Sequence, residues 1–150
     1  VLLGTDAGYG FVGKIGDLFT KNKAGKAVVS IPKGGRILSP KMVNDSNAMI
    51  AAVSNEGRLL VFPISELPEL ARGKGNKIIN IPSSRLQARE EFVVDFAVIG
   101  AADALVVHSG KRYLVMKAKD LEHYRGERGR RGHKLPRGFQ KVDKLGIEGS

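Results

Sequence analysis

The sequence predicts an all-β fold built from about three repeated units of roughly four strands each. A basic loop that contains glycine recurs at Gly25, Gly75 and Gly132, in steps of 50 and 57 residues. A polar turn that contains glycine, with an apolar run on either side, recurs at nearly the same spacing. No stretch sustains the periodicity of an amphipathic helix. Four-strand units that repeat at intervals of about 40–50 residues are typical of propeller-like arrays.

A β-hairpin is expected at the start of each unit. Short apolar runs separated by a polar turn with glycine are the usual sequence signature of a hairpin. The turn glycines are Gly8, Gly57 and Gly110, in steps of 49 and 53 residues. The predicted hairpins pair residues 1–5 with 9–15, 49–53 with 58–62, and 104–108 with 112–116.

An acidic residue followed by leucine comes next in each unit, as Asp17-Leu18, Glu66-Leu67 and Asp120-Leu121. Because the pair recurs, we expect these carboxylates to hold a bend in each unit rather than to form a single paired-acid site. The basic loop follows, and then a further apolar strand. That strand is predicted at 28–32 and 78–82, and the third repeat has a shorter match to it at Leu135-Pro136.

The whole chain, 1–150, is predicted to be one domain with repeats at about 1–48, 49–100 and 101–145 and a tail at 146–150. Residues 85–91 are polar and are interpreted as a connector, and 144–150 are expected to fray. Closed propellers use about four to eight blades, so three units cannot close a ring. Together with the absence of an initiator methionine at Val1, this indicates a piece of a longer array.

The net charge of +10 favours a polyanionic partner. The excess is uneven, because residues 101–150 carry twelve Lys and Arg against six Asp and Glu. No stretch approaches the length of a transmembrane segment, so nucleic acid is favoured over a membrane. The chain has no cysteine, which excludes disulfides and thiolate zinc sites and is compatible with a reducing cytosol.

The three basic loops are the candidate phosphate-binding elements. Glycine lets a backbone approach a phosphate closely, and flanking Lys and Arg supply charge and hydrogen-bond donors. A single loop of this kind would be interpreted as a charged, solvent-exposed connection between strands. Three such loops at equivalent positions of the repeats, on a basic chain, favour phosphate binding. The candidate DNA-binding residues are Lys23, Lys26, Arg72, Lys74, Lys77, Arg125, Arg128, Arg130, Arg131, His133, Lys134 and Arg137.

The glycines at 8–13 match two nucleotide-binding patterns, but their context fits neither. A P-loop needs Ser or Thr after its lysine, and Ile15 follows Lys14 here. The dinucleotide pattern needs a helix that starts inside the motif and an acidic residue about twenty positions later, and neither is evident. The repeat instead places Gly8 in a hairpin turn.

No catalytic constellation is visible. His108, His123 and His133 lack the spacing of metal ligands, and Tyr9 and Tyr113 fall in predicted strands. No nucleophile, base and orienting group can be assembled from the motifs. The sequence therefore predicts a binding module that is not itself an enzyme, with no cofactor, metal or small-molecule substrate.

The runs 72–82 and 124–132, together with the repeat, resemble the C-terminal domain of ParC, which is the A subunit of topoisomerase IV and a relative of the gyrase A subunit. The resemblance covers essentially the whole chain. It implies the last three blades of a β-pinwheel, a propeller variant in which neighbouring blades exchange a strand. It also implies a bacterial, cytoplasmic and nucleoid-associated protein that binds and bends duplex DNA on a basic rim and helps the catalytic core choose DNA crossings.

In the whole enzyme that this resemblance implies, chemistry belongs to an active-site tyrosine in another region and to ATP hydrolysis on a separate partner protein. The gyrase loop Q-R-R-G-G-K-G is degenerate here. Residues 130–134 keep the arginine pair and one glycine, but His133 stands at the second glycine. This divergence favours bending of DNA over full wrapping.

Two alternatives remain open from the sequence. The leading one is a propeller-type module that binds an acidic protein. The weaker one is a β-rich RNA-binding protein, although the aromatic platform expected for single strands is missing. Loss of binding with salt and a preference for bent or crossed duplex would separate a DNA-binding module from both.

Overall fold

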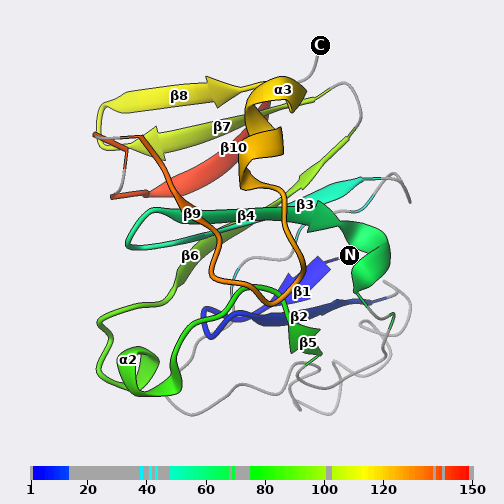
Figure 1. Ribbon diagram of the computed structural model, residues 1–150, viewed down its shortest axis with the longest axis vertical. Coiled ribbons are helices and arrows are strands. Elements are labelled where there is room, and N and C mark those ends of the chain that lie inside the picture. The colour runs from blue at the N-terminus through cyan, green and yellow to red at the C-terminus, as the bar shows by residue number, and fades with distance from the viewer. Residues whose placement is uncertain are drawn as a thin grey trace, which may run out of the picture.

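The computed structural model describes residues 2–13, 38, 41, 43, 48–67, 69, 75–100, 103–136, 138–139 and 141–148. Three antiparallel sheets lie one above another in Figure 1. The first sheet has the order β1-β2-β5, the second β6-β3-β4-β9 and the third β10-β7-β8. This arrangement confirms the predicted all-β fold.

All three predicted hairpins are present. They consist of β1 (Leu2–Gly4) with β2 (Tyr9–Val12), β3 (Met49–Ser54) with β4 (Arg58–Pro63), and β7 (Ala104–Ser109) with β8 (Arg112–Met116). Their turn glycines all have positive φ, at 88° for Gly8, 79° for Gly57 and 61° for Gly110. Only glycine adopts this conformation without strain, which explains why the glycine recurs. The three turns lie on the same side of the molecule, at the left in Figure 1, and we call this side the turn end.

Each of the first two hairpins receives a strand from the repeat that follows it. β5 (Asn76–Lys77) belongs to the second repeat and pairs with β2, so that Lys77 lies opposite Tyr9. β9 (His133–Lys134) belongs to the third repeat and pairs with β4, so that Lys134 lies opposite Arg58. The exchange of strands between neighbouring units is therefore confirmed. In the third sheet as described, β8 and β10 are the two edge strands.

On their other side the hairpins pair with a strand that lies later in the same repeat. β6 (Val93–Ile99) pairs with β3, and β10 (Lys144–Glu148) pairs with β7. In the first sheet the backbone N–H of Leu2 donates to the carbonyl of Lys41 at 2.7 Å. The expectation that the chain frays from Lys144 onward is wrong for residues 144–148, because they pair with β7 and Leu145 is buried in the core.

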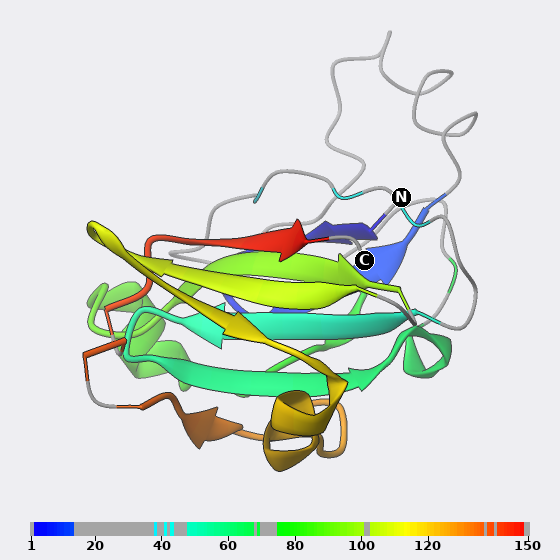
Figure 2. The same cartoon turned by 90° about the horizontal axis from the view of Figure 1, so that it is seen from above.

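The middle sheet is buried on both faces, and its sequence shows why. Ile50 and Ala52 of β3 pack toward the first sheet, whereas Ala51 and Val53 pack toward the third. Successive residues of a strand point to opposite faces, so a strand between two layers must be apolar throughout. The continuous run Leu59–Phe62 of β4 follows the same rule, and its side chains are at most 1% exposed. The two cores are therefore the two interfaces between the three sheets. Figure 2 looks down on the same stack from above.

Short helical turns occupy the connections. They are η1 (Ile64–Glu66), α2 (Ser83–Gln87), α3 (Ala118–Leu121) and η2 (Glu122–Tyr124). The stretch 85–91, which was interpreted as a connector, begins inside α2, leads to β6 and carries the buried Glu91. One prediction for these connections is wrong. The apolar strand predicted at 78–82 is absent, since β5 ends at Lys77 and Ile78 and Ile79 are buried in bends.

The acidic residues of the bends have different partners. The carboxylate of Asp120 accepts a hydrogen bond from the backbone N–H of Lys117 at 3.2 Å, as expected for a residue that holds its own bend. Glu66 instead accepts from the backbone N–H of Arg128 in the next repeat, at 3.3 Å. Asp17 and the first basic loop lie outside the described residues.

Candidate nucleic-acid interface

The third basic loop, residues 125–134, crosses from the third sheet to the edge of the second. Backbone hydrogen bonds attach it along its length to the second repeat. The N–H of Gly126 donates to the carbonyl of Val61 at 3.0 Å, and the N–H of Gly129 donates to that of Ile78 at 2.8 Å. The N–H of Asn80 donates to the carbonyl of Arg130 at 2.9 Å. The loop is therefore fixed before any ligand binds, which lowers the entropic cost of binding.

Glycine is required where the loop enters β9. Gly132 has φ +77°, and a Cβ atom at this position would lie 2.5 Å from the carbonyl oxygen of Leu59. Such a contact is impossible without movement of the backbone. At Gly75 and Gly132 the glycine thus lets one repeat lie directly against the one before it, and close approach to a phosphate is not needed to explain these two glycines.

Arg131 faces inward and forms an ion pair with Glu91. Its two terminal nitrogens donate to the two carboxylate oxygens of Glu91 at 2.6 and 2.8 Å, and Nη1 also donates to the carbonyl of Asn80 at 2.9 Å. The Glu91 side chain is completely buried. Two-pronged pairing of this kind is the strongest arrangement between arginine and a carboxylate.

Charge balance around Glu91 controls its protonation. Burial by itself favours the neutral carboxyl, but the hydrogen bonds and charge of Arg131 and the charge of Arg85 outweigh it and hold the pKa of Glu91 below its ordinary value. Nε of Arg85 lies 3.7 Å from Glu91, and its Nη2 pairs with Glu56 next to the β3–β4 turn. The ion pairs therefore join α2, the turn end of the second sheet and the loop 125–134.

Arg128 is also engaged within the protein, whereas Arg130 projects outward. Nη1 of Arg128 donates to the carbonyl of Lys77 at 2.8 Å. Arg130 pairs with Glu127 at 3.0 Å, and both side chains are largely exposed, at 70% and 78%. An exposed pair of this kind contributes little stability, so the Arg130 guanidinium can exchange Glu127 for another anion at small cost.

Four of the remaining predicted DNA-binding residues are described by the structure. Arg125, His133 and Lys134 are exposed along the loop and β9. Lys77 is half-buried, and its Nζ lies 3.3 Å from Oδ1 of Asn80 and 5.9 Å from the centre of the Tyr9 ring. The structure thus brings Lys77, at the edge of the first sheet, against the loop 125–134, since Arg128 of that loop donates to the Lys77 carbonyl. Lys23, Lys26, Arg72, Lys74 and Arg137 lie outside the described residues.

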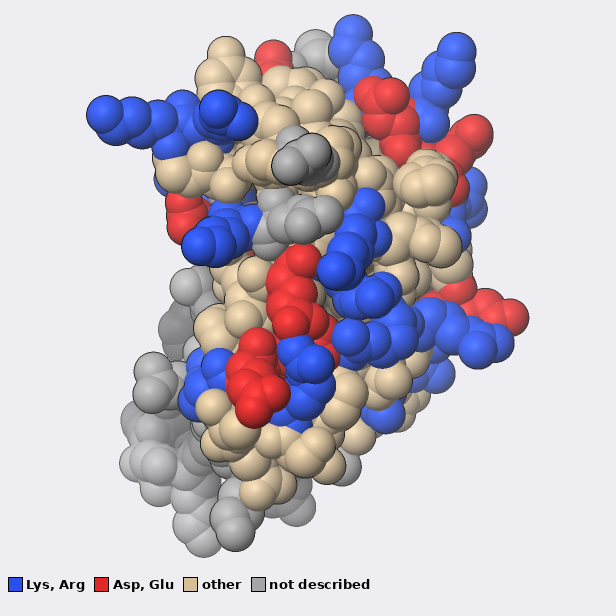
Figure 3. Space-filling view, turned by 60° about the vertical axis from the view of Figure 1, so that its left-hand side comes forward, with Lys and Arg blue, Asp and Glu red and all other residues tan. Residues whose placement is uncertain are grey.

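Figure 3 brings the left-hand side of Figure 1 forward and shows Lys and Arg side chains over much of this surface, with Asp and Glu among them. Arg85 and Arg89 are partly exposed cations that lie outside the glycine loops. Arg89 lies 2.9 Å from the buried carboxylate of Asp6 and stacks its guanidinium 4.3 Å from the centre of the Phe92 ring. The sequence did not indicate the pair of Arg89 with Asp6, because Asp6 lies in a different repeat.

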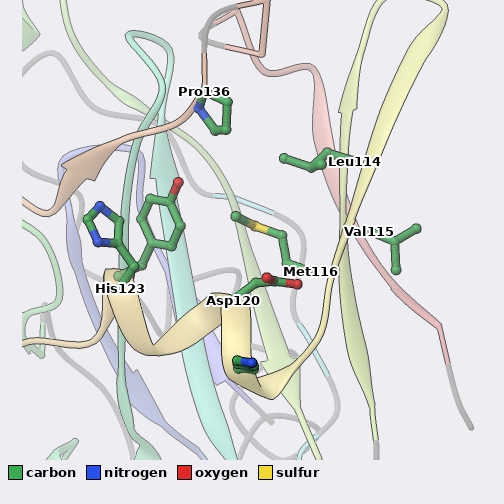
Figure 4. Close-up of a pocket in the computed structure, with 8 residues that line it drawn as sticks. Leu114, Val115, Met116, Asp120, His123 and Pro136 are labelled. Atoms are coloured by element: carbon green, nitrogen blue, oxygen red, sulfur yellow. The ribbon is translucent and has the colours of Figure 1, made fainter.

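An apolar groove lies beside β8 (Figure 4). It has a volume of about 460 Å³ and is lined by Leu114, Val115, Met116, Lys119, Asp120, His123, Tyr124 and Pro136. Burial and the nearby charge of Asp120 raise the pKa of Tyr124, so its hydroxyl stays protonated at neutral pH. The groove offers apolar surface rather than a set of catalytic groups.

Within the described ranges, no three His, Cys, Asp or Glu residues lie close enough together to hold a metal ion. The helices found among these residues are all too short or too polar to cross a lipid bilayer.

Comparison with known proteins identifies the fold and the family. The three-sheet array with exchanged strands is a β-propeller of the pinwheel kind. The family model for the DNA gyrase C-terminal domain, beta-propeller, matches residues 1–44 and 48–99. The chain belongs to this family.

The relatives agree with this assignment. The chain is 55% identical over 148 residues to the A subunit of DNA topoisomerase 4 from Pseudomonas aeruginosa, covering 98% of this chain and 20% of that protein. It is 41% identical to the A subunit of DNA topoisomerase 4 from Escherichia coli, over 99% of this chain and 20% of that protein. The chain therefore spans about a fifth of the length of these relatives.

Solved structures show the same fold. The E. coli ParC C-terminal domain superimposes with a TM-score of 0.89 at 40% identity, over 99% of this chain and 60% of that one. A DNA gyrase A C-terminal domain superimposes with a TM-score of 0.69 at 16% identity, over 94% of this chain and 46% of that one, which supports the fold alone. The resemblance noted from the sequence is thus confirmed.

Proposed function

We propose that this chain binds and bends duplex DNA through its basic loops and helps a topoisomerase IV select DNA crossings for strand passage. The observation that carries the proposal is the fixed loop 125–134, which presents Arg125, Arg130, His133 and Lys134 as exposed groups at the edge of the second sheet. Preformed cationic loops suit the phosphate backbone, which attracts Lys and Arg without regard to base sequence.

In the complete enzyme, this domain would act beside a catalytic core and an ATP-hydrolysing partner in the bacterial cytoplasm. Decatenation and relaxation would then depend on those partners for chemistry, and the chain itself would supply only the geometry of the bound DNA. Curvature is the property it can impose, because cations on successive repeats attract one side of the duplex.

Binding to a duplex of about 30 base pairs across a salt series tests the proposal. A DNA-binding surface should lose affinity steeply as salt rises, with a slope close to 0.9 per phosphate contact. A matched single-stranded RNA serves as the competitor. Binding that is independent of salt, or equally tight binding to the RNA, would contradict the proposal and favour one of the two alternatives.

A protein-interaction role has one specific observation in its favour, namely the apolar groove beside β8. Tyr113 on the same strand is 68% exposed, which is unusual for a large aromatic residue. Purified catalytic core offered to the chain in the absence of DNA would test this role. Its retention by the chain, and loss of retention in Tyr113→Ser, would support it.

A further inference from the structure

A second group of cations lies at the turn end of the third sheet, apart from the loop 125–134. Lys111 lies in the β7–β8 turn and Arg112 begins β8, whereas Lys141 precedes β10 and Lys144 begins it. All four side chains are exposed. They come from two segments about thirty residues apart, and none was among the residues that the glycine loops indicated. We call them the third-sheet patch.

Backbone contacts hold the two segments together. Oγ of Ser109 donates to the carbonyl of Lys141 at 2.7 Å, and the N–H of Asp143 donates to the carbonyl of His108 at 2.8 Å. Lys144 lies opposite His108 in the sheet, and Ser109 lies opposite Arg112. Adjacent strands are about 4.8 Å apart, so the backbone positions of Arg112 and Lys144 lie roughly 10 Å apart across the three strands, at the turn end of the sheet and on its opposite faces.

The carboxylate nearest to the patch along the chain is already engaged. Oδ2 of Asp143 accepts a hydrogen bond from the N–H of Gly110 at 2.6 Å. In the part of the chain that the structure describes, the four cations of the patch make no ion pair with a carboxylate. Arg131, Arg85, Arg89 and Lys41 differ in this respect, since each lies within 4 Å of an acidic group.

Glycine also leaves space for one of these cations. Gly138 has φ +96°, and a Cβ atom there would lie 3.1 Å from Nη1 of Arg112. The guanidinium therefore rests against the backbone of the segment that leads from β9 to β10, rather than extending freely. An arginine held in this way loses less conformational entropy when it binds an anion.

The third-sheet patch continues from the loop 125–134. Lys134 ends β9 opposite Arg58, next to the turn of the second hairpin, and the N–H of Leu135 donates to the carbonyl of Gly57 at 2.8 Å. From there the chain runs through Pro136 to Lys141 and the third sheet. Cations thus follow one another along the turn end from the second sheet to the third.

We propose that the third-sheet patch binds the phosphate backbone of double-stranded DNA, as a contact additional to the loop 125–134. This inference rests on the proposed DNA-binding function and extends it to residues outside the basic loops. A duplex carries one charge per roughly 1.7 Å of its axis, so a surface about 10 Å wide faces several phosphates. The patch offers ammonium and guanidinium groups without an element that could enter a groove, so it contributes affinity and orientation rather than base recognition.

The test uses two variants of the full chain with the same loss of charge. Lys111→Gln with Arg112→Gln alters the patch, whereas Lys117→Gln with Lys119→Gln removes two exposed cations at the opposite end of β8. Titration with a 30-base-pair duplex should show about tenfold weaker binding for the patch variant at moderate salt. Its salt slope should fall by about 2, as expected for two lost phosphate contacts. The control variant should change affinity less than threefold.

Protection from acetylation gives a second readout that requires no substitution. Bound duplex should slow the acetylation of Lys111, Lys141 and Lys144 in the unmodified chain, and leave Lys117 and Lys119 unchanged. Equal weakening in the two variants, or equal acetylation of the two sets of lysines, would overturn the inference while leaving the DNA-binding proposal intact. If the unmodified chain fails to bind duplex at low salt, the proposed function itself is wrong and the patch has no role in it.

Discussion

Arginines that are adjacent in the sequence have different roles in this fold. Arg130 is 70% exposed and pairs with the equally exposed Glu127, while Arg131 pairs through two hydrogen bonds with the buried Glu91. The sequence treated both as phosphate contacts, because charge density alone cannot show which side chain turns inward. Charge reversal at Arg131 would therefore disturb the fold as well as any ligand, and Arg130 and Lys134 are the better probes of DNA binding.

Replacement of Arg131 by alanine should destabilise the protein strongly. Removal of one partner from a buried ion pair leaves an uncompensated charge and costs about 3 kcal/mol. Arg130→Ala is the matched control and should change stability by less than about 0.5 kcal/mol, since it alters an exposed loop side chain. Urea unfolding of the two variants measures the difference. Equal midpoints would mean that Arg131 contributes no more to the fold than its neighbour.

The Glu91 pair should also make stability depend on pH. Because the folded state lowers the pKa of Glu91 from its ordinary value of 4.5, the stabilisation is complete above that value and is lost as pH falls through the lower, folded pKa. The free energy of unfolding of the unmodified protein should therefore decrease below pH 4.5 more steeply than that of Glu91→Gln, which cannot titrate at this position. Parallel curves for the two proteins would contradict the assignment.

At the scale of the elements, exchange of strands explains both the success and the limit of sequence-based prediction. The hairpins were predicted almost to the residue, because their pattern and turn glycines are local. The strand expected at 78–82 was wrong, because Ile78 and Ile79 are apolar for burial between sheets and the pairing instead falls on Asn76 and Lys77. β10 was missed for a similar reason, since its partner β7 begins forty residues earlier.

Two glycine substitutions test how the exchanged strand is held. Gly132→Ala would place a Cβ atom 2.5 Å from the carbonyl oxygen of Leu59, so β9 could pair with β4 only after a shift of the backbone. Gly110→Ala is the control, because its φ of +61° is also positive but no heavy atom lies within 4 Å of the added group. The control should lose about 1 kcal/mol from backbone strain alone.

Gly132→Ala should lose at least about 1 kcal/mol more than Gly110→Ala in urea unfolding. Amide exchange should become faster at His133 and Lys134 in this variant, while β7 and β8 keep their protection. A loss no greater than that of Gly110→Ala would show that the loop accommodates a side chain without moving.

At the scale of the whole molecule, the distribution of charge matters more than any single residue. The all-β fold was evident from the repeat, and the family from the repeat together with the runs 72–82 and 124–132. The arrangement of cations along the turn end was not, because it joins Lys134 with residues of β8 and β10 that only pairing within and between sheets brings together. Under the proposed function, a duplex on this surface would meet the cations over several phosphates, and a rigid, straight duplex would reach only part of them.

Bending can therefore be tested by the stiffness of the DNA. Smooth bending of a site of 20–30 base pairs by 40–90° costs on the order of 1–6 kcal/mol, and a central nick removes part of that cost. A nicked 30-base-pair duplex should bind at least about fivefold more tightly than an intact duplex of the same sequence and charge. In a duplex labelled at both ends, energy transfer should rise on binding as the ends approach. Equal affinities and unchanged transfer would mean that the chain holds DNA without bending it, and the selection of crossings would then have to arise elsewhere in the enzyme.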